Sequence, residues 1–154
     1  MTPRLRRLQA DHQRIVAELA DHPHVRLVEA TGNPPDRYIV EFLVNGLSPQ
    51  PDGSPAAAVS HRAEVFLPLD YPRRAPFCRM LTPVFHPNID PQKICIGDHW
   101  SADQSLVELV IRIAQMICFQ SYNTKSPLNA AAAVWASEHA DRLPLQAVDL
   151  SGAH

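Results

Sequence analysis

Apolar side chains recur every three or four positions near the N-terminus, which predicts an amphipathic helix. Thr2 and Pro3 are suited to begin it, as a capping hydroxyl and a proline at the first helical position. A second helix is predicted after residues 101–104, Ser-Ala-Asp-Gln, which match a capping box. Its apolar residues, from Leu106 to Phe119, face all directions, so we expect it to be covered on most sides in the core. Residues 130–142 form the last predicted helix.

Alternation of apolar and polar side chains predicts four short strands between the first two helices. They cover residues 25–30, 38–44, 62–67 and 77–81. Residues 47–60 are rich in Pro, Gly, Ser and Ala and show no period, so we expect a long loop there. One helix, four successive strands and two further helices predict an α+β fold with a four-stranded antiparallel meander. A single domain is expected over residues 1–143, followed by a flexible tail over residues 144–154.

Composition narrows the class of protein further. The chain has 154 residues, enough for one domain with a real core, and no apolar run reaches the ~18 residues of a membrane-spanning helix. The polar N-terminus predicts no signal peptide. Three cysteines, an odd number, argue against a disulfide framework and for a reducing compartment, so we expect a cytoplasmic protein. A net charge of −2 without a lysine-rich block gives no reason to expect nucleic-acid binding.

The segment from His86 to Trp100 carries the candidate chemistry. Pro87 and Pro91 forbid a helix or a central strand there, because each lacks a backbone N–H and fixes φ. An irregular segment between two apolar runs is expected at the surface, where its backbone groups find partners or water. Cys95 is therefore predicted on an ordered, accessible loop with polar neighbours, which is the setting of a nucleophilic thiol.

The order of these elements, together with several short motifs, resembles the ubiquitin-conjugating enzyme family. The motifs are His86-Pro87-Asn88, Ile94-Cys95, Trp100-Ser101, the upstream Tyr71-Pro72 and the downstream Ser126-Pro127-Leu128. The likeness covers roughly residues 3–142. His-Pro-Asn alone would be weak, but the whole set in this order is much more specific.

The resemblance implies that Cys95 accepts the C-terminal carboxyl group of a ubiquitin-like modifier as a thioester and yields it to an amine, usually of a lysine. A thiolate suits both halves of this reaction, because it is a good nucleophile and a good leaving group. Asn88 would donate to the developing oxyanion or brace the loop near Cys95. His86 would hold the loop. The implied partners are the modifier, an activating enzyme, an acceptor protein and a ligase; no cofactor is expected, since the ATP step belongs to the activating enzyme.

Some positions depart from the family pattern. Ser126 stands where members often carry an acidic residue that helps the incoming lysine lose its proton, and serine is a poor base. Asp98 or His99 could take over that role. Together with Trp100, these two residues are expected to support the loop around Cys95. Arg73 follows Tyr71-Pro72 where many members have an aromatic residue used in ligase binding. We therefore expect docking to a ligase of unusual type.

A basic face is predicted on the first helix, where Arg6, Arg7 and Arg14 lie outside the apolar stripe. It could dock an acidic partner, or it could be an ordinary solvated helix face.

The gaps from Asn88 to Cys95 and from Cys95 to Trp100 are shorter than in typical members of the family, which indicates a shortened loop around Cys95. These short gaps and the composition rich in Ala, Arg and Pro resemble compact bacterial relatives. Those belong to ubiquitin-like conjugation pathways that are often linked to phage defence.

Two other functions compete with catalysis. One is an inactive relative that only binds a modifier or partner protein; the retained Cys95 argues against it, while Ser126 and the short loop argue for it. The other is a zinc site formed by Cys95, His99 and His86. Four zinc ligands cannot be assembled easily from this sequence, and no Cys-x-x-Cys pair is present.

Overall fold

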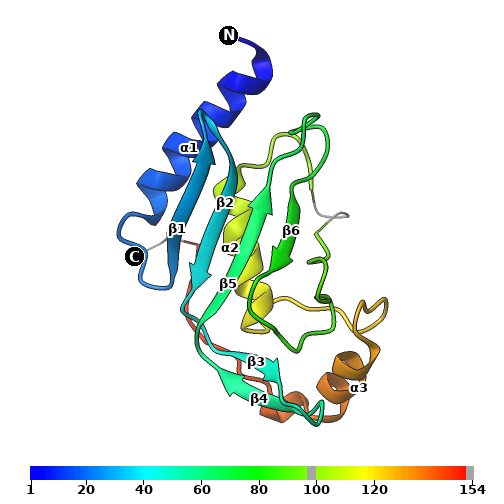
Figure 1. The fold of residues 1–154 in the computed structure, drawn as a ribbon. Coiled ribbons are helices and arrows are strands. Elements are labelled where there is room, and N and C mark those ends of the chain that lie inside the picture. Colours follow the sequence, from blue (N-terminus) through cyan, green and yellow to red (C-terminus); the bar gives the residue numbers. More distant parts are fainter. Residues whose placement is uncertain (97–99, 152–154) are drawn as a thin grey trace.

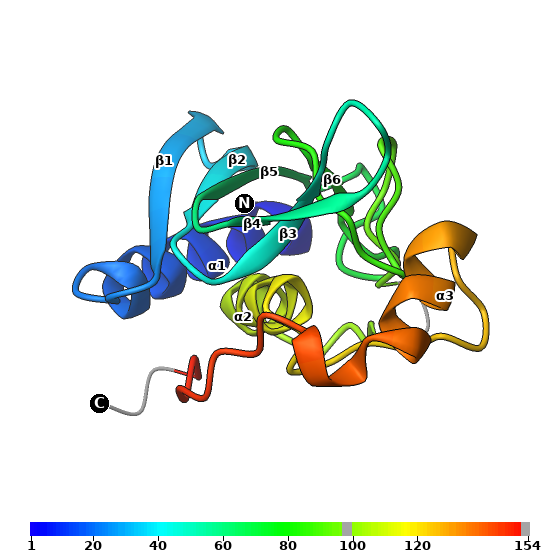
Figure 2. The ribbon, with the colours of Figure 1, turned by 90° about the horizontal axis from the view of Figure 1, so that it is seen from below.

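A four-stranded antiparallel sheet forms one layer of the molecule, and two helices cover one of its faces (Figures 1 and 2). The computed structural model describes residues 1–96 and 100–151. The strands are β1 (Val25–Gly32), β2 (Pro35–Phe42), β5 (His61–Phe66) and β6 (Phe77–Met80), in the order β1-β2-β5-β6. The covering helices are α1 (Pro3–Leu19) and α2 (Leu106–Ile117). The α+β fold with an antiparallel meander is confirmed.

The main core lies between the sheet and these two helices. Tyr38 and Val40 of β2 and Val65 of β5 are fully buried, because alternate side chains of each strand point toward α2. Nine of the twelve residues of α2 are buried, as the all-round apolar pattern predicts. The opposite face of the sheet carries charges instead. There Glu41 lies between Arg26 and Arg62, and Glu64 lies between Arg37 and Arg79.

A two-stranded hairpin replaces the long loop that the sequence predicts over residues 47–60. Its strands are β3 (Gly46–Pro49) and β4 (Pro55–Ala58), and they pair only with each other. The turn is closed by Gln50 and Ser54, whose backbone N–H and carbonyl form a hydrogen bond of 2.8 Å. The prediction failed because a strand of alanines and prolines has no alternation of apolar and polar side chains.

The start of α2 also differs from the prediction. Residues 101–104 form a turn, in which the Gln104 N–H donates to the Ser101 carbonyl at 3.0 Å, and the helix begins after them. The capping box is formed by Ser105 and Glu108, each side chain accepting from the other's backbone N–H. Both serines match the same short pattern, so the predicted cap at Ser101 lies one turn too early.

The C-terminal part wraps below α2. Helix α3 (Ala130–Glu138) is followed by the short 3₁₀ helix η2 (Ala140–Arg142), so the predicted last helix is split at His139. Residues 145–151 then run back toward α1, and Leu150 is fully buried in the main core. The flexibility of residues 144–154 stays a prediction. No helix in the part of the chain that the structure describes has the length and hydropathy needed to cross a membrane.

Candidate active site

His86 forms the buried base of the turn that begins the candidate site. Its Nδ1 accepts the backbone N–H of Asn88 at 3.0 Å, so the ring proton of the neutral histidine lies on Nε2. Burial lowers the pKa of His86 to about 4, which keeps the ring neutral near pH 7. The ring contacts Phe119 at 4.7 Å between centroids. His86 is placed behind the site, where it supports the turn and cannot contact a substrate in the groove.

Cys95 lies at the surface on a segment that is fixed on both sides. Its backbone N–H donates to the carbonyl of Asn88 at 3.0 Å, and the neighbouring Ile94 donates to the carbonyl of Cys78 in β6 at 2.9 Å. Ile94 and Ile96 are buried, so the side chain between them points outward. Of the three cysteines only Cys95 is exposed; burial raises the pKa of the thiol of Cys78.

Asn88 connects this turn to residues 121–129, the loop between α2 and α3, which we call the α2–α3 loop. Its Nδ2 donates to the carbonyl of Asn123 at 2.8 Å, and its Oδ1 accepts the N–H of Asn123 at 2.8 Å. The carbonyl of Pro87 accepts the N–H groups of Leu128 (2.8 Å) and Asn129 (3.1 Å). The side chain of Asn88 therefore braces the loop, and one of its two N–H donors is used for this.

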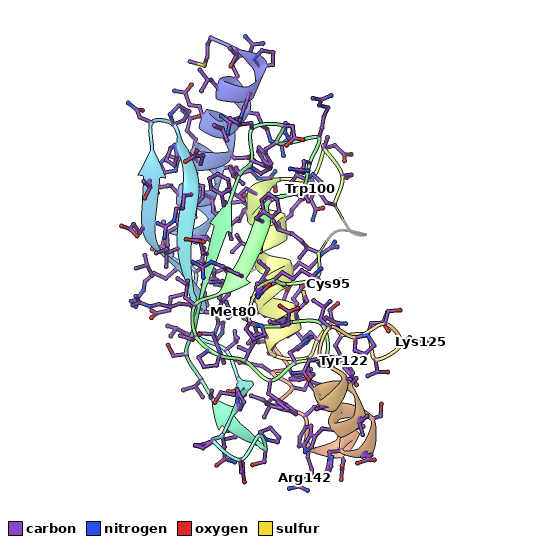
Figure 3. All side chains as sticks on the ribbon, turned by 45° about the vertical axis from the view of Figure 1, so that its right-hand side comes forward. Met80, Cys95, Trp100, Tyr122, Lys125 and Arg142 are labelled. Carbon is purple, nitrogen blue, oxygen red and sulfur yellow. The ribbon has the colours of Figure 1, made fainter. Side chains whose placement is uncertain are left out.

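A groove of about 530 Å³ lies where the α2–α3 loop meets Cys95. It is lined by Asn88, Cys95, Tyr122 and Ser126 among others, so the structure brings three of the four predicted catalytic residues to one cavity. Figure 3 shows Cys95 between Trp100 and Tyr122, with Lys125 on the same side of the molecule. We call this cavity the loop groove.

Tyr122 was not predicted as a site residue. Its ring packs edge-on against Phe119 at 5.4 Å and remains 40% exposed in the loop groove. Phe119 in turn has a φ of 62°, which turns the chain sharply at the end of α2. Nothing local in the sequence marks this position, because a tyrosine in a polar loop is common. Tyr122 packs on Phe119, which packs on His86, and these contacts join residues whose proximity the sequence does not indicate.

Trp100 supports the loop from outside the groove. Its Nε1 donates to the carbonyl of Pro72 at 2.8 Å and its ring packs against Tyr71 at 5.7 Å. Trp100 therefore attaches the end of the Cys95 segment to the chain before β6. Asp98 and His99, the alternative proton acceptors, lie outside the described residues.

Arg7 does not lie on the solvent side of α1 as the sequence analysis expected. Its guanidinium pairs with buried Asp11 at 2.8 Å and donates to Tyr71 and to the carbonyls of Ala102 and Gln104. The helical period places it at the border of the apolar stripe, and Asp11 draws it inward. Arg7 thus holds α1 against the turn before α2.

The other three predicted partner-binding arginines are exposed. Arg14 pairs with Glu18 at 2.6 Å, Arg6 donates to the carbonyl of Met1, and Arg73 is exposed after Pro72. Their role in partner binding stays a prediction. Within residues 1–96 and 100–151, no cluster of three His, Cys, Asp or Glu side chains is arranged to hold a metal ion.

Comparisons with known proteins identify what the chain is similar to. The sequence model of the family described as "Ubiquitin-conjugating enzyme" matches residues 11–147. The ubiquitin-conjugating enzyme E2 N of Drosophila melanogaster is 30% identical over 143 residues, which are 90% of this chain and 87% of that protein. The E2 N of Macaca fascicularis is 31% identical over 98 residues, which are 60% of this chain and 63% of that protein.

Solved structures agree in fold. One from Trypanosoma cruzi, assigned as a ubiquitin-conjugating enzyme, has a TM-score of 0.66 at 15% identity and covers 90% of this chain and 93% of its own. Another so assigned, from Plasmodium yoelii, has a TM-score of 0.66 at 20% identity and covers 94% and 90%. At these identities the likeness shows the fold alone.

Proposed function

The chain belongs to the ubiquitin-conjugating enzyme family, and from this premise we propose that Cys95 carries a ubiquitin-like modifier as a thioester. The modifier would be received from an activating enzyme and passed to an amine, in the ordinary case a lysine of an acceptor protein. The observation that supports this most is the exposure of Cys95 alone among three cysteines, on a segment held by Asn88 and β6. An acyl carrier needs an accessible thiol in a fixed place.

The proposed reaction has two acyl transfers. In the first, the Cys95 thiolate attacks the thioester carbonyl of the modifier on the activating enzyme, and that enzyme's thiolate leaves. In the second, the acceptor amine attacks the carbonyl carbon on Cys95, the C–S bond breaks, and the Cys95 thiolate leaves. The amine proton passes to water or to a nearby base.

Two side chains of the loop groove have proposed roles in the second transfer. The N–H of Asn88 that is not used by Asn123 would donate to an oxyanion formed on Cys95, a role supported by the position of both residues in the lining of the loop groove. Ser126, which lines the same groove, would accept a hydrogen bond from the incoming amine, although a hydroxyl is too weak a base to remove its proton at neutral pH. We therefore expect the intrinsic rate of transfer to be low without a ligase.

An inactive binding module is the second candidate. Ser126 in place of an acidic residue favours it, because a protein that only presents a modifier needs no help for the amine. A place in a bacterial conjugation pathway linked to phage defence remains a further proposal, which rests on composition and shortened loops alone.

The test is modifier loading. The protein is incubated with its presumed activating enzyme, a ubiquitin-like modifier and ATP, then run on non-reducing and reducing gels. We expect an adduct one modifier larger that dithiothreitol removes. Cys95→Ala should abolish it, Cys95→Ser should give an adduct that resists dithiothreitol, and Cys118→Ala, a change to a buried thiol, should keep it. A reducible adduct on Cys95→Ala would show that the assignment is wrong.

A further inference from the structure

A second groove opens at Cys95 on the side of strand β6. It has a volume of about 420 Å³ and is lined by β6, by the chain before it and by residues 92–96. Among the described residues it shares only Cys95 with the loop groove. Cys95 therefore lies where two separate grooves meet. We call this second cavity the β6 groove.

The β6 groove is basic and apolar. Its charged lining consists of Arg74, Arg79 and Lys93 against one carboxylate, Glu64. That carboxylate is already engaged: the hydrogen bond from Arg79 lowers the pKa of Glu64, and Arg37 pairs with it at 2.6 Å. Arg74 also pairs with Asp70, outside the lining, at 3.7 Å. Among the described residues Lys93 is therefore the lining cation without an ion pair, and the surface beside it favours negative charge in a ligand.

The apolar part of the groove suits an extended chain. Phe77 of β6 is 55% exposed and Phe66 of β5 is 39% exposed, while the guanidinium of Arg74 lies over the ring of Phe77 at 5.7 Å. Strand β6 is the last strand of the sheet, and Ile94 already joins its outer edge by donating its N–H to the Cys78 carbonyl at 2.9 Å. A segment bound in the groove therefore lies across the exposed side chains of β5 and β6 and adds no strand to the sheet.

We propose that the β6 groove binds an extended segment of the acceptor protein that carries acidic residues beside its reactive amine. This proposal deepens the proposed function and rests on it. We expect the modifier to bind on the other side of Cys95. There the loop groove shares Arg112 and Gln115 with a larger cavity of about 1060 Å³ between α1 and α2. A folded domain joined to Cys95 needs the larger surface, and the smaller β6 groove is left for a short segment of the acceptor.

The test measures peptide binding first, because binding does not require loading. A fluorescein-labelled peptide with one lysine flanked by glutamates is compared with the same peptide flanked by glutamines, using anisotropy. We expect the acidic peptide to bind about three- to tenfold more tightly at low salt, with the difference shrinking as salt rises. The acidic peptide should also slow alkylation of Cys95 by N-ethylmaleimide, since Cys95 lines the groove.

The two lysines of the chain provide a matched pair of variants. Lys93 lines the β6 groove, whereas Lys125 lies beyond the other groove, next to Ser126. Lys93→Glu should abolish the preference for the acidic peptide, and Lys125→Glu should keep it. Equal binding of both peptides to the unchanged protein, or loss of the preference in Lys125→Glu alone, would overturn the proposal.

Measuring the transfer reaction decides whether the β6 groove binds the acceptor or the modifier. With the protein loaded at Cys95, the acidic peptide should accept the modifier about three- to tenfold faster than the glutamine peptide, and Lys93→Glu should remove this difference without slowing loading. Slowed loading with unchanged peptide preference would assign the groove to the modifier and overturn the proposal. If Cys95 cannot be loaded at all, the proposed function fails, while the anisotropy result still decides whether the groove binds acidic segments.

Discussion

The side chain of Asn88 binds both backbone polar groups of Asn123, 35 residues further along the chain, through two hydrogen bonds of 2.8 Å. Asn88→Ala removes both bonds and leaves the backbone of Asn123 without these partners. We expect a loss of about 1–3 kcal/mol in the free energy of unfolding, measured by urea denaturation. Transfer from Cys95 to an amine should fall by about 10²–10³ if the second N–H also stabilises the oxyanion.

Asn123→Ala is the matched control for this prediction. The two hydrogen bonds from the Asn88 side chain go to the backbone of residue 123, so both should survive in Asn123→Ala. Transfer should then stay within about threefold of the unchanged protein. Among the described residues, the side chain of Asn123 accepts the N–H of Lys125 and no other hydrogen bond. Equal damage from both variants would contradict the proposed role of the Asn88 amide.

The pairing of Asn88 with Asn123 also shows where sequence reasoning stops. The strong periods of β2, β5 and α2 placed the sheet and the core helix correctly, because burial on one face forces those patterns. The brace has no local signal, since it joins two polar loops that are distant in the chain. The hairpin β3–β4 was missed for a different reason: Leu47 of β3 packs in a core cluster, but β4 is one proline followed by three alanines and shows no alternation of apolar and polar side chains.

The residues of the candidate site were partly predictable. Cys95 and Asn88 follow from short motifs, and the structure brings them with Ser126 to one groove. Tyr122 and the inward turn of Arg7 depend on packing partners, Phe119 and Asp11, that a linear pattern does not identify.

Ser126 offers a test of how the amine loses its proton. Ser126→Asp should increase transfer to lysine at pH 7 by about tenfold, because a carboxylate beside Cys95 can accept the proton. Ser121→Asp places the same charge elsewhere in the loop groove and should have a smaller effect. Single-turnover discharge of the loaded protein measures both. If the two variants respond equally, general electrostatic attraction is the cause, and position 126 has no special role.

Arg7 should matter for stability and Arg6 should not. Arg7→Ala leaves the buried carboxylate of Asp11 without its cation, and we expect a loss of about 2–3 kcal/mol in the free energy of unfolding. Arg6 is exposed, and within the described part of the chain its guanidinium donates only to the carbonyl of Met1, so Arg6→Ala should change stability by less than about 0.5 kcal/mol. Thermal denaturation of the two variants checks the difference. A similar loss in both would contradict the inward role of Arg7.

Ser105 and Ser101 give a second matched pair. Ser105→Ala removes the cap of α2 and should cost about 1 kcal/mol, because its Oγ accepts the N–H of Glu108 at 3.2 Å. Ser101 is exposed, and its hydroxyl donates to Asp103, its one side-chain hydrogen bond among the described residues, so Ser101→Ala should cost less than about 0.5 kcal/mol. Urea denaturation measures both losses. A larger loss of stability in Ser101→Ala than in Ser105→Ala would show that α2 begins at Ser101, as the sequence pattern predicts.

The lowered pKa of buried His86 predicts that the free energy of unfolding decreases at acidic pH. Its folded pKa of about 4 lies below the unfolded value of 6.5, so below pH 6.5 the unfolded chain binds a proton that the folded chain refuses. The contribution of His86 is complete above that pH and is lost progressively as the pH falls toward 4. The gap of about 2.5 pH units, at ~1.4 kcal/mol each, corresponds to about 3 kcal/mol at most.

Urea denaturation at pH 7.5 and pH 4.5 measures this loss. His86→Gln should lower stability at pH 7.5 but show a shallower fall toward pH 4.5, whereas His24→Gln, at a less buried histidine, should keep the steep fall. An unchanged slope in His86→Gln would assign the acid sensitivity to another group.

A single backbone oxygen, that of Pro87, accepts hydrogen bonds from Leu128 and from Asn129, the residue that caps α3. The turn that contains Asn88 and the first turn of α3 are therefore connected through one backbone oxygen, and we expect a displacement of one to move the other. A spectroscopic label at exposed Val134 of α3, which does not line the loop groove, would report displacement of that turn. Because the Asn88 carbonyl also accepts the N–H of Cys95, we expect a displacement of the first turn of α3 to change the position of Cys95 as well.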